Sequence, residues 1–190
     1  MSHTHADVHF VDSNASTPVD FADGTALDIP LLTEAPAGLP LAEFGLAVDA
    51  GDIGNFVKID GTVGVRSIIG TGPTILQNVT IRVYRRDTLA AEPFPGTLVF
   101  STTQSLVGAL NRSTISFNFV DGGNGTAGQP QVPPSYYAYT MTIFRDEAID
   151  TTSGLPVGGV LTPIVTGPIQ LTGESSTTHV EEPDHHEHLT

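Results

Sequence analysis

Short segments of alternating apolar and polar residues, separated by turns rich in Gly and Pro, run through the middle of this chain. In the segment 55–67, NFVKIDGTVGVRS, Val57, Ile59, Val63 and Val65 alternate with polar or small residues. This is the period of a β-strand, whose successive side chains point to opposite faces. The same pattern predicts strands within 74–86, 97–106, 113–121, 135–146 and 163–175. These segments constrain the chain to a fold built from strands.

The segments between these strands carry the residues that stop strands and allow tight turns. They read GTGP (70–73), EPFPG (92–96), DGGNGTAGQPQVPP (121–134) and SGLPVGG (153–159). The best helix candidate is 41–48, which Gly45 interrupts, so we expect an extended or turn-rich segment there. The sequence thus predicts an all-β, antiparallel sandwich or barrel. We expect this domain to span 39–175, with an N-terminal arm at 1–38 and an acidic, His-rich tail at 176–190.

The first ten residues, MSHTHADVHF, also alternate with period two. A sandwich leaves edge strands with unpaired backbone groups, to which a strand from a neighbouring molecule can add. The N-terminal arm is therefore a candidate donor strand. Its apolar face, which a neighbour would bury, consists of Thr4, Ala6, Val8 and Phe10.

The opposite face of this segment, together with the C-terminal tail, carries every histidine of the chain. Neutral imidazole binds transition metals, and carboxylates on Gly-rich loops such as 49–55 and 121–125 suit Ca²⁺. The candidate metal ligands are His3, His5, His9, His185, His186, His188, Asp49 and Asp52. The alternative is a polar strand face, a solvated tail and ordinary turn residues, and we favour it because no metal-site spacing is matched. No cofactor is expected to be required.

The charge of the chain limits its partners. The formal net charge is −14, and all seven basic residues lie between Lys58 and Arg145. Such a chain repels nucleic acids and anionic membranes, and no apolar stretch reaches the length of a membrane span. Self-association would then require specific contacts. We expect no secretory signal peptide, since the start lacks a cationic region followed by an apolar one.

Enzymatic groups are scarce in the expected core. The chain has no Cys, and the strand segments have no His, which removes the strongest nucleophile and the commonest general base. None of the common nucleophile, phosphate-binding or zinc-protease motifs is present. The sequence therefore predicts a protein that is not an enzyme.

The texture of NFVKIDGTVGVRS, VTIRVYRRDT, LVFSTTQSL and STISFNFVD resembles that of exosporium and spore-appendage proteins of bacterial spores. The resemblance covers about 55–175 and rests on strand rhythm, without a diagnostic motif. It implies a jelly-roll sandwich and a homo-oligomeric structural subunit that forms a fibre, tube or layer on a bacterial cell or spore surface. Spore-appendage subunits often carry cross-linking Cys, which this chain lacks. The alternative function is an adhesin-like module that binds a carbohydrate or receptor through its loops or its Tyr136, Tyr137 and Tyr139 strand.

Overall fold

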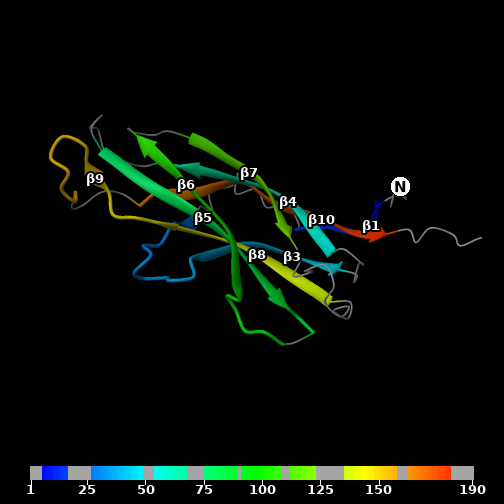
Figure 1. Ribbon diagram of the computed structural model, residues 1–190. Helices are drawn as coiled ribbons and strands as arrows, with labels where there is room; N and C mark the ends of the chain where they lie inside the picture. Colours follow the sequence, from blue (N-terminus) through cyan, green and yellow to red (C-terminus); the bar gives the residue numbers. More distant parts are fainter. Residues whose placement is uncertain are drawn as a thin grey trace, which may run out of the picture.

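The computed structural model describes residues 6–16, 27–48, 54–67, 75–89, 91–107, 112–122, 135–157 and 162–180. No helix occurs within these ranges. The strands are β1 (Ala6–Ala15), β2 (Leu27–Asp28), β3 (Leu39–Val48), β4 (Gly54–Arg66), β5 (Ile75–Asp87), β6 (Thr97–Val107), β7 (Arg112–Gly122), β8 (Ser135–Arg145), β9 (Ile149–Asp150) and β10 (Ile164–Val180). They form two sheets that lie against each other (Figure 1).

The order of the strands defines the fold. Sheet A has the order β1-β10-β4-β7, with β2 also on β10, and sheet B has the order β3-β8-β5-β6, with β9 on β5. All of these pairings are antiparallel. Most connections between consecutive long strands pass from one sheet to the other, and the first strand pairs with the last. Two four-stranded sheets wound in this order form a jelly roll, which confirms the predicted fold class.

The core lies between the sheets and consists of the inward faces that the alternation predicted. Each large aliphatic side chain enclosed there contributes about 1.5–3 kcal/mol relative to exposure. Almost no surface remains exposed on Ile59, Val63, Val65, Val79, Ile81, Val83, Leu46, Tyr139, Met141, Ile143, Ile169 and Leu171. The ring of Phe44 stacks on that of Tyr139 with 5.4 Å between centroids, which joins β3 to β8 inside the core.

Three phenylalanines close the side of the sandwich where β6 and β7 end the two sheets. The Phe100 ring of β6 stacks on Phe119 and Phe117 of β7, at centroid distances of 4.5 Å and 4.9 Å. Phe117 lies over Gly61 of β4, where a Cβ would come within 2.1 Å of the Phe117 ring. Gly61 is therefore the residue that lets an aromatic ring lie flat across the sheet.

The outer face of sheet B is covered by the chain itself, so β5 and β8 are buried on both faces. Residues 29–38 and 91–96 lie across this face: Arg82 donates to the Pro36 carbonyl at 3.3 Å, and Phe94 packs edge-on against Tyr84. Thr140 and Thr142, which alternate with the core residues of β8, are 3% and 0% exposed as a result. The alternation of these strands predicted one buried face and did not reveal the segments that cover the other.

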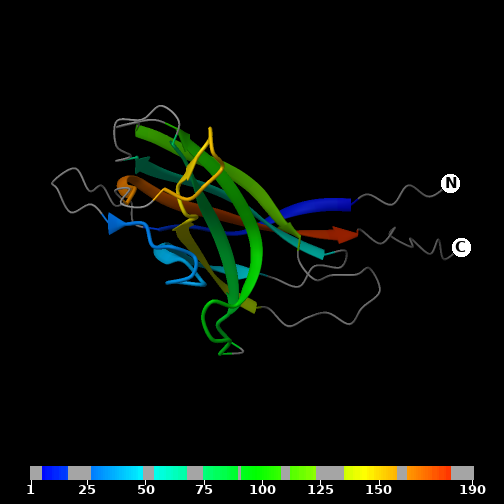
Figure 2. The same ribbon diagram turned by 90° about the vertical axis from the view of Figure 1, so that its left-hand side faces the viewer.

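The first and last described strands both belong to sheet A, so the sandwich extends beyond the expected domain limits of 39–175. β1 pairs with β10 from Ala6 opposite Val180 to Ala15 opposite Thr172, so these two strands lie side by side in one sheet (Figure 2). The segment 41–48, expected to be extended, is part of β3 at the edge of sheet B. The alternation of the first ten residues indicated a strand, but it did not indicate that this strand pairs within its own chain.

Candidate functional site

A β-bulge in β1 decides which of its side chains face the sandwich. The register with β10 shifts between Phe10, opposite Ser176, and Asp12, opposite Ser175. Because side chains alternate along a strand, one extra residue exchanges the inner and outer faces. Val8 and Phe10 therefore point outward before the bulge. Asp12 and Asn14 point inward after it.

The inward residues of β1 bond to the backbone of β3, the edge strand of sheet B. The Ala47 N–H donates to the Asp12 carboxylate at 2.9 Å, and the Asn14 amide donates to the Gly45 carbonyl at 2.8 Å. These bonds satisfy backbone groups that an edge strand would otherwise leave unpaired. β1 thus closes one side of the sandwich by joining the edges of both sheets.

Two serines fasten the same strand to sheet A and to β3. The backbone N–H of Ser16 donates to the Leu171 carbonyl, and the Leu171 N–H donates to the Ser16 hydroxyl. The Ser175 hydroxyl lies within 2.8 Å of the Ala47 carbonyl and 3.3 Å of the Asp12 carbonyl. Among the described side chains of β1 no large apolar one is fully buried. Hydrogen bonds therefore hold β1 in place.

The predicted assembly residues lie on the outer face of sheet A. Val8 and Phe10 are 62% and 61% exposed, an unusual environment for large apolar side chains. Of Ala6 only the backbone is described, and Thr4 lies outside the described residues. Contact between these residues and a neighbouring molecule stays a prediction.

The candidate metal ligands fall almost entirely outside the described ranges. His9, opposite Thr177, is described and exposed. His3, His5, His185, His186, His188, Asp49 and Asp52 are not described. Within the described residues no group of three or more His, Cys, Asp or Glu side chains is placed to hold a metal ion. The metal expectation therefore stays a prediction.

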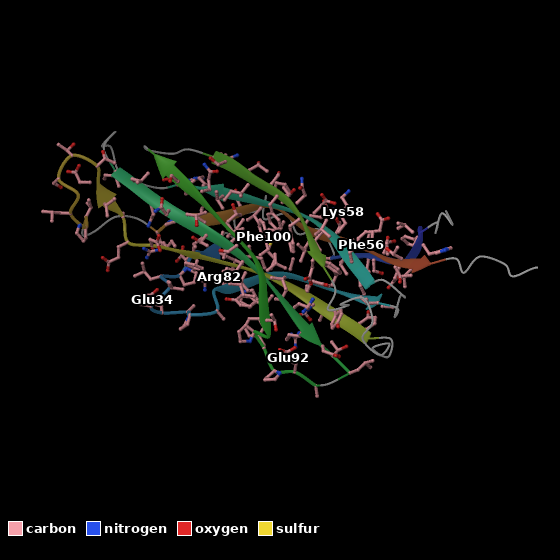
Figure 3. All side chains as sticks on the ribbon, viewed as in Figure 1. Glu34, Phe56, Lys58, Arg82, Glu92 and Phe100 are labelled. Carbon is pink, nitrogen blue, oxygen red and sulfur yellow. The ribbon has the colours of Figure 1, made fainter. Side chains whose placement is uncertain are left out.

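An apolar patch, defined as Val8, Phe10, Phe56 and Val120, occupies the end of this outer face where β1 begins. Phe10 and Phe56 share one row across the sheet, since Ser176 of β10 lies between them and pairs with both. Val120 is 61% exposed on β7, one row further along, opposite Lys58. Lys58 and Phe56 lie on one side of the molecule, and Glu34, Arg82 and Glu92 lie on the other (Figure 3).

A polar hollow of about 510 Å³ adjoins the patch on the same face. It is lined by Ser13, Asn14, Ala15, Lys58, Asp60, Thr172, Gly173 and Glu174. Lys58, the only lysine of the chain, lies 3.7 Å from Asp60, and both side chains are more than half exposed. Exposed pairs of this kind contribute little stability, so Lys58 is free to change partners.

The opposite side of the sandwich presents the edges of β6 and β7. β6 has no charged residue and no Pro over its whole length, Thr97–Val107, but its register with β5 shifts at Val99, which forms a bulge. β7 is free of charge and Pro from Ser113 to Val120, and its register with β4 has no shift. Natural sandwiches usually block such edges with Lys, Pro or bulges, and β1 does so with its bulge and Asp12. Among the described strands, β7 is therefore the edge with the fewest of these devices.

A buried cluster of three polar side chains joins the two sheets beneath the apolar patch. The Arg85 guanidinium donates to the Asp121 carboxylate at 2.8 Å, and the Tyr139 hydroxyl donates to the same oxygen at 2.9 Å. Arg85 and Tyr139 belong to sheet B, Asp121 belongs to sheet A, and the side chains of Arg85 and Asp121 are only 13% and 10% exposed. Asp121, the first residue of the Gly-rich loop considered for Ca²⁺, is the counter-ion of Arg85.

These contacts shift the pKa values of Arg85 and Tyr139. Burial acts to lower the pKa of Arg85, but the charge and hydrogen bond of Asp121, together with Tyr139 and Tyr137, outweigh burial and the net shift is upward. Burial, and then the charge of Asp121, raise the pKa of the Tyr139 hydroxyl. Arg85 also stacks over the Tyr137 ring at 5.0 Å. Tyr137 and Tyr139 therefore belong to the interior, which corrects the alternative expectation of a tyrosine platform for sugars.

Comparisons with known proteins return only distant likenesses. No family model and no curated protein matches the chain. Among solved structures, the infectious bursal disease virus VP2 subviral particle is 12% identical with a TM-score of 0.39, over 90% of this chain and 42% of that chain. A structure described as "CBM4 structure and function" is 15% identical with a TM-score of 0.26, over 89% and 94%. The semi-empty VLP of Macrobrachium rosenbergii nodavirus is 9% identical with a TM-score of 0.24, over 95% and 97%.

These likenesses do not decide a function, since identity and TM-scores are low throughout. The fold class follows from the strand order of the chain itself. Within the described residues, no helix is long and apolar enough to cross a membrane.

We predict that Asp121→Asn destabilises the protein by about 3 kcal/mol, because it leaves the buried Arg85 cation without a counter-charge. Chemical denaturation measures the change in the free energy of unfolding. Asp60→Asn is the matched control, since its ion pair is exposed, and we expect a change of less than about 1 kcal/mol. Equal losses in the two variants would contradict a structural role for the buried group.

We also predict a loss of stability in alkali that depends on Tyr139. Its folded-state pKa lies above the unfolded value of about 10, so its contribution is complete below pH 10 and is lost as pH rises further. The free energy of unfolding should fall by up to about 1.4 kcal/mol per pH unit above pH 10 from this group. Tyr139→Phe should show a shallower decline in denaturation curves collected at several alkaline pH values. An equally steep alkaline decline in Tyr139→Phe and in the unchanged protein would contradict this prediction.

Proposed function

We propose that the chain is a non-enzymatic structural subunit that assembles with copies of itself by exchanging β1. In the assembly, β1 of one copy occupies on the next copy the place that it takes in its own sheet. The supporting observation is the way β1 is held. Asp12, Asn14 and Ser16 bind it to both sheets through hydrogen bonds, without a large apolar side chain locked in the core.

Exchange conserves these contacts, because the receiving copy offers the same β10 and β3 edges. The cost is then confined to the segment that connects β1 to the sandwich. Ten residues, 17–26, separate Ser16 from Leu27, and they span at most about 35 Å when extended. A neighbour within that distance can receive the strand. Each copy gives and receives one strand, so the contact is head-to-tail and produces rings or filaments.

The setting of this proposal is the surface of a bacterial cell or spore. Its support is the resemblance to exosporium and spore-appendage proteins. A surface layer also suits a net charge of −14, which opposes non-specific clumping and leaves assembly to specific contacts. The edge of β7, which has no bulge, charge or Pro from Ser113 to Val120, offers a further place for copies to meet.

Cysteine pairs across β1 and β10 test the exchange. Ala15 lies opposite Thr172 on the outer face, and the chain has no Cys of its own. After mild oxidation of Ala15→Cys/Thr172→Cys, we expect a ladder of disulfide-linked chains on a non-reducing gel, because the two residues come from different molecules. Either single variant is the control and should give nothing larger than a dimer.

Electron micrographs of the same samples should show rings or filaments. Only intramolecular disulfides, in a protein that stays monomeric at high concentration, would contradict the proposal. Such a result would also leave β1 as an ordinary edge strand of its own sheet.

A second candidate function is carbohydrate binding, and the polar hollow on sheet A favours it. Carboxylates, a lysine and small hydroxyl side chains line it, with Phe10 and Phe56 of the patch close by. A glycan array on the full chain tests this function: we expect saturable binding that Asp60→Ala weakens at least about tenfold, while Glu147→Ala, outside the hollow, leaves it unchanged. Absence of binding across the array would set the function aside.

A further inference from the structure

We propose that the outer face of sheet A pairs with the same face of a second copy, around a two-fold axis that runs parallel to the strands between β10 and β4. The inference rests on the proposed function, in that both copies belong to one assembly. It uses a surface that strand exchange leaves free.

The outer face of sheet A differs from that of sheet B in how much apolar surface it exposes. Residues 29–38 and 91–96 cover the outer face of sheet B, whereas sheet A leaves Val8, Phe10 and Val120 about three-fifths exposed. Apolar side chains gathered on a sheet face mark a contact surface, and sheets that pack face to face keep their strands within about 30° of each other. The sandwich is therefore built to pack a further sheet on this side.

Charge complementarity identifies that sheet as a second copy. Glu174 of β10 and Lys58 of β4 lie opposite each other in one row, on the two central strands. A two-fold axis between these strands places β10 of one copy over β4 of the other. Each Lys58 then meets Glu174 of the second copy, and the contact forms twice. Since Lys58 is the only lysine of a chain with a net charge of −14, few other surfaces offer such a match.

The outer strands complement each other under the same operation, because β1 lies over β7 of the second copy. Phe10 shares its row with Gly122, through Ser176 and Phe56, so the axis places Phe10 over Gly122 of the second copy. Among the described residues other than its chain neighbours, no heavy atom lies within 4 Å of the point where a Cβ of Gly122 would be. The large ring therefore meets the one residue of the row without a side chain.

Val120 and the polar hollow form the second such pair. Val120 and Ser13 end the row that contains Lys58 and Glu174. The axis places the exposed Val120 over Ser13 of the second copy, at the rim of its hollow. One projecting side chain and one hollow per copy make the face self-complementary, as a two-fold contact requires.

The test uses a protein in which β1 cannot exchange. Oxidised His9→Cys/Thr177→Cys monomer, separated by size, holds β1 in its own sheet through a pair that alternates with the outward Phe10 and Ser176, and sedimentation velocity then measures pairing alone. We expect this locked protein to dimerise reversibly. Lys58→Glu and Glu174→Lys should each weaken the dimer at least about tenfold, and the double charge swap should restore it to within about threefold. Val120→Asp should abolish the dimer.

The matched control is Glu147→Lys, an exposed residue on another part of the molecule that undergoes the same charge change as Glu174→Lys. An equal effect of both variants would show that net charge alone governs association and would overturn the inference. A locked protein that stays monomeric, or one that binds a soluble oligosaccharide in the hollow as a monomer, would overturn it as well. A disulfide ladder without dimers of the locked monomer would refute this pairing and leave strand exchange standing. Dimers of the locked monomer without a disulfide ladder would refute strand exchange and leave this pairing standing.

Discussion

The backbone groups at the edges of the two sheets are the constraint on which this structure depends. A sandwich with four long strands in each sheet has open edges on two sides, and every second residue of an edge strand carries unpaired N–H and C=O groups. On one side, the bulge at Phe10/Asp12 turns Asp12 and Asn14 inward to bond with β3. On the other side, Phe100, Phe117 and Phe119 fill the gap between β6 and β7 by stacking of their rings.

The two sides of the sandwich are therefore closed by different kinds of contact. The β1/β3 side is closed by a terminal segment that hydrogen bonds hold in place. The β6/β7 side is closed by apolar stacking, which forms only once both sheets are in place. The buried Arg85–Asp121–Tyr139 group then fixes the sheets to each other at the end where β1 begins. A rigid body with one terminal strand held by polar contacts is what strand exchange between subunits needs, because the body keeps its shape while the strand changes owner.

Sequence patterns predicted the central strands and their inward faces because burial on one side imposes a period of two. The covering of sheet B was not predictable, since residues 29–38 and 91–96 carry no regular period and act through single contacts such as Arg82 with Pro36. The pairing of Arg85 with Asp121 was not predictable for a similar reason. The residues are 36 positions apart, and a Gly-rich loop after Asp121 is also typical of a calcium site. The bulge in β1 likewise has no signal in the alternation of MSHTHADVHF.

The placement of positive charge links the interior to the surface. Six of the seven basic residues are arginines. Of these, Arg82, Arg85, Arg86 and Arg145 are engaged with carbonyls, carboxylates or rings of the same chain. The one lysine is on the exposed face of sheet A, in an ion pair too exposed to bind it firmly. An acidic surface on which Lys58 is a loosely held cation beside apolar side chains disfavours random association, since most encounters bring like charges together. It favours the one orientation in which that cation meets a carboxylate, and this selectivity allows a protein with a net charge of −14 to self-associate in an ordered way.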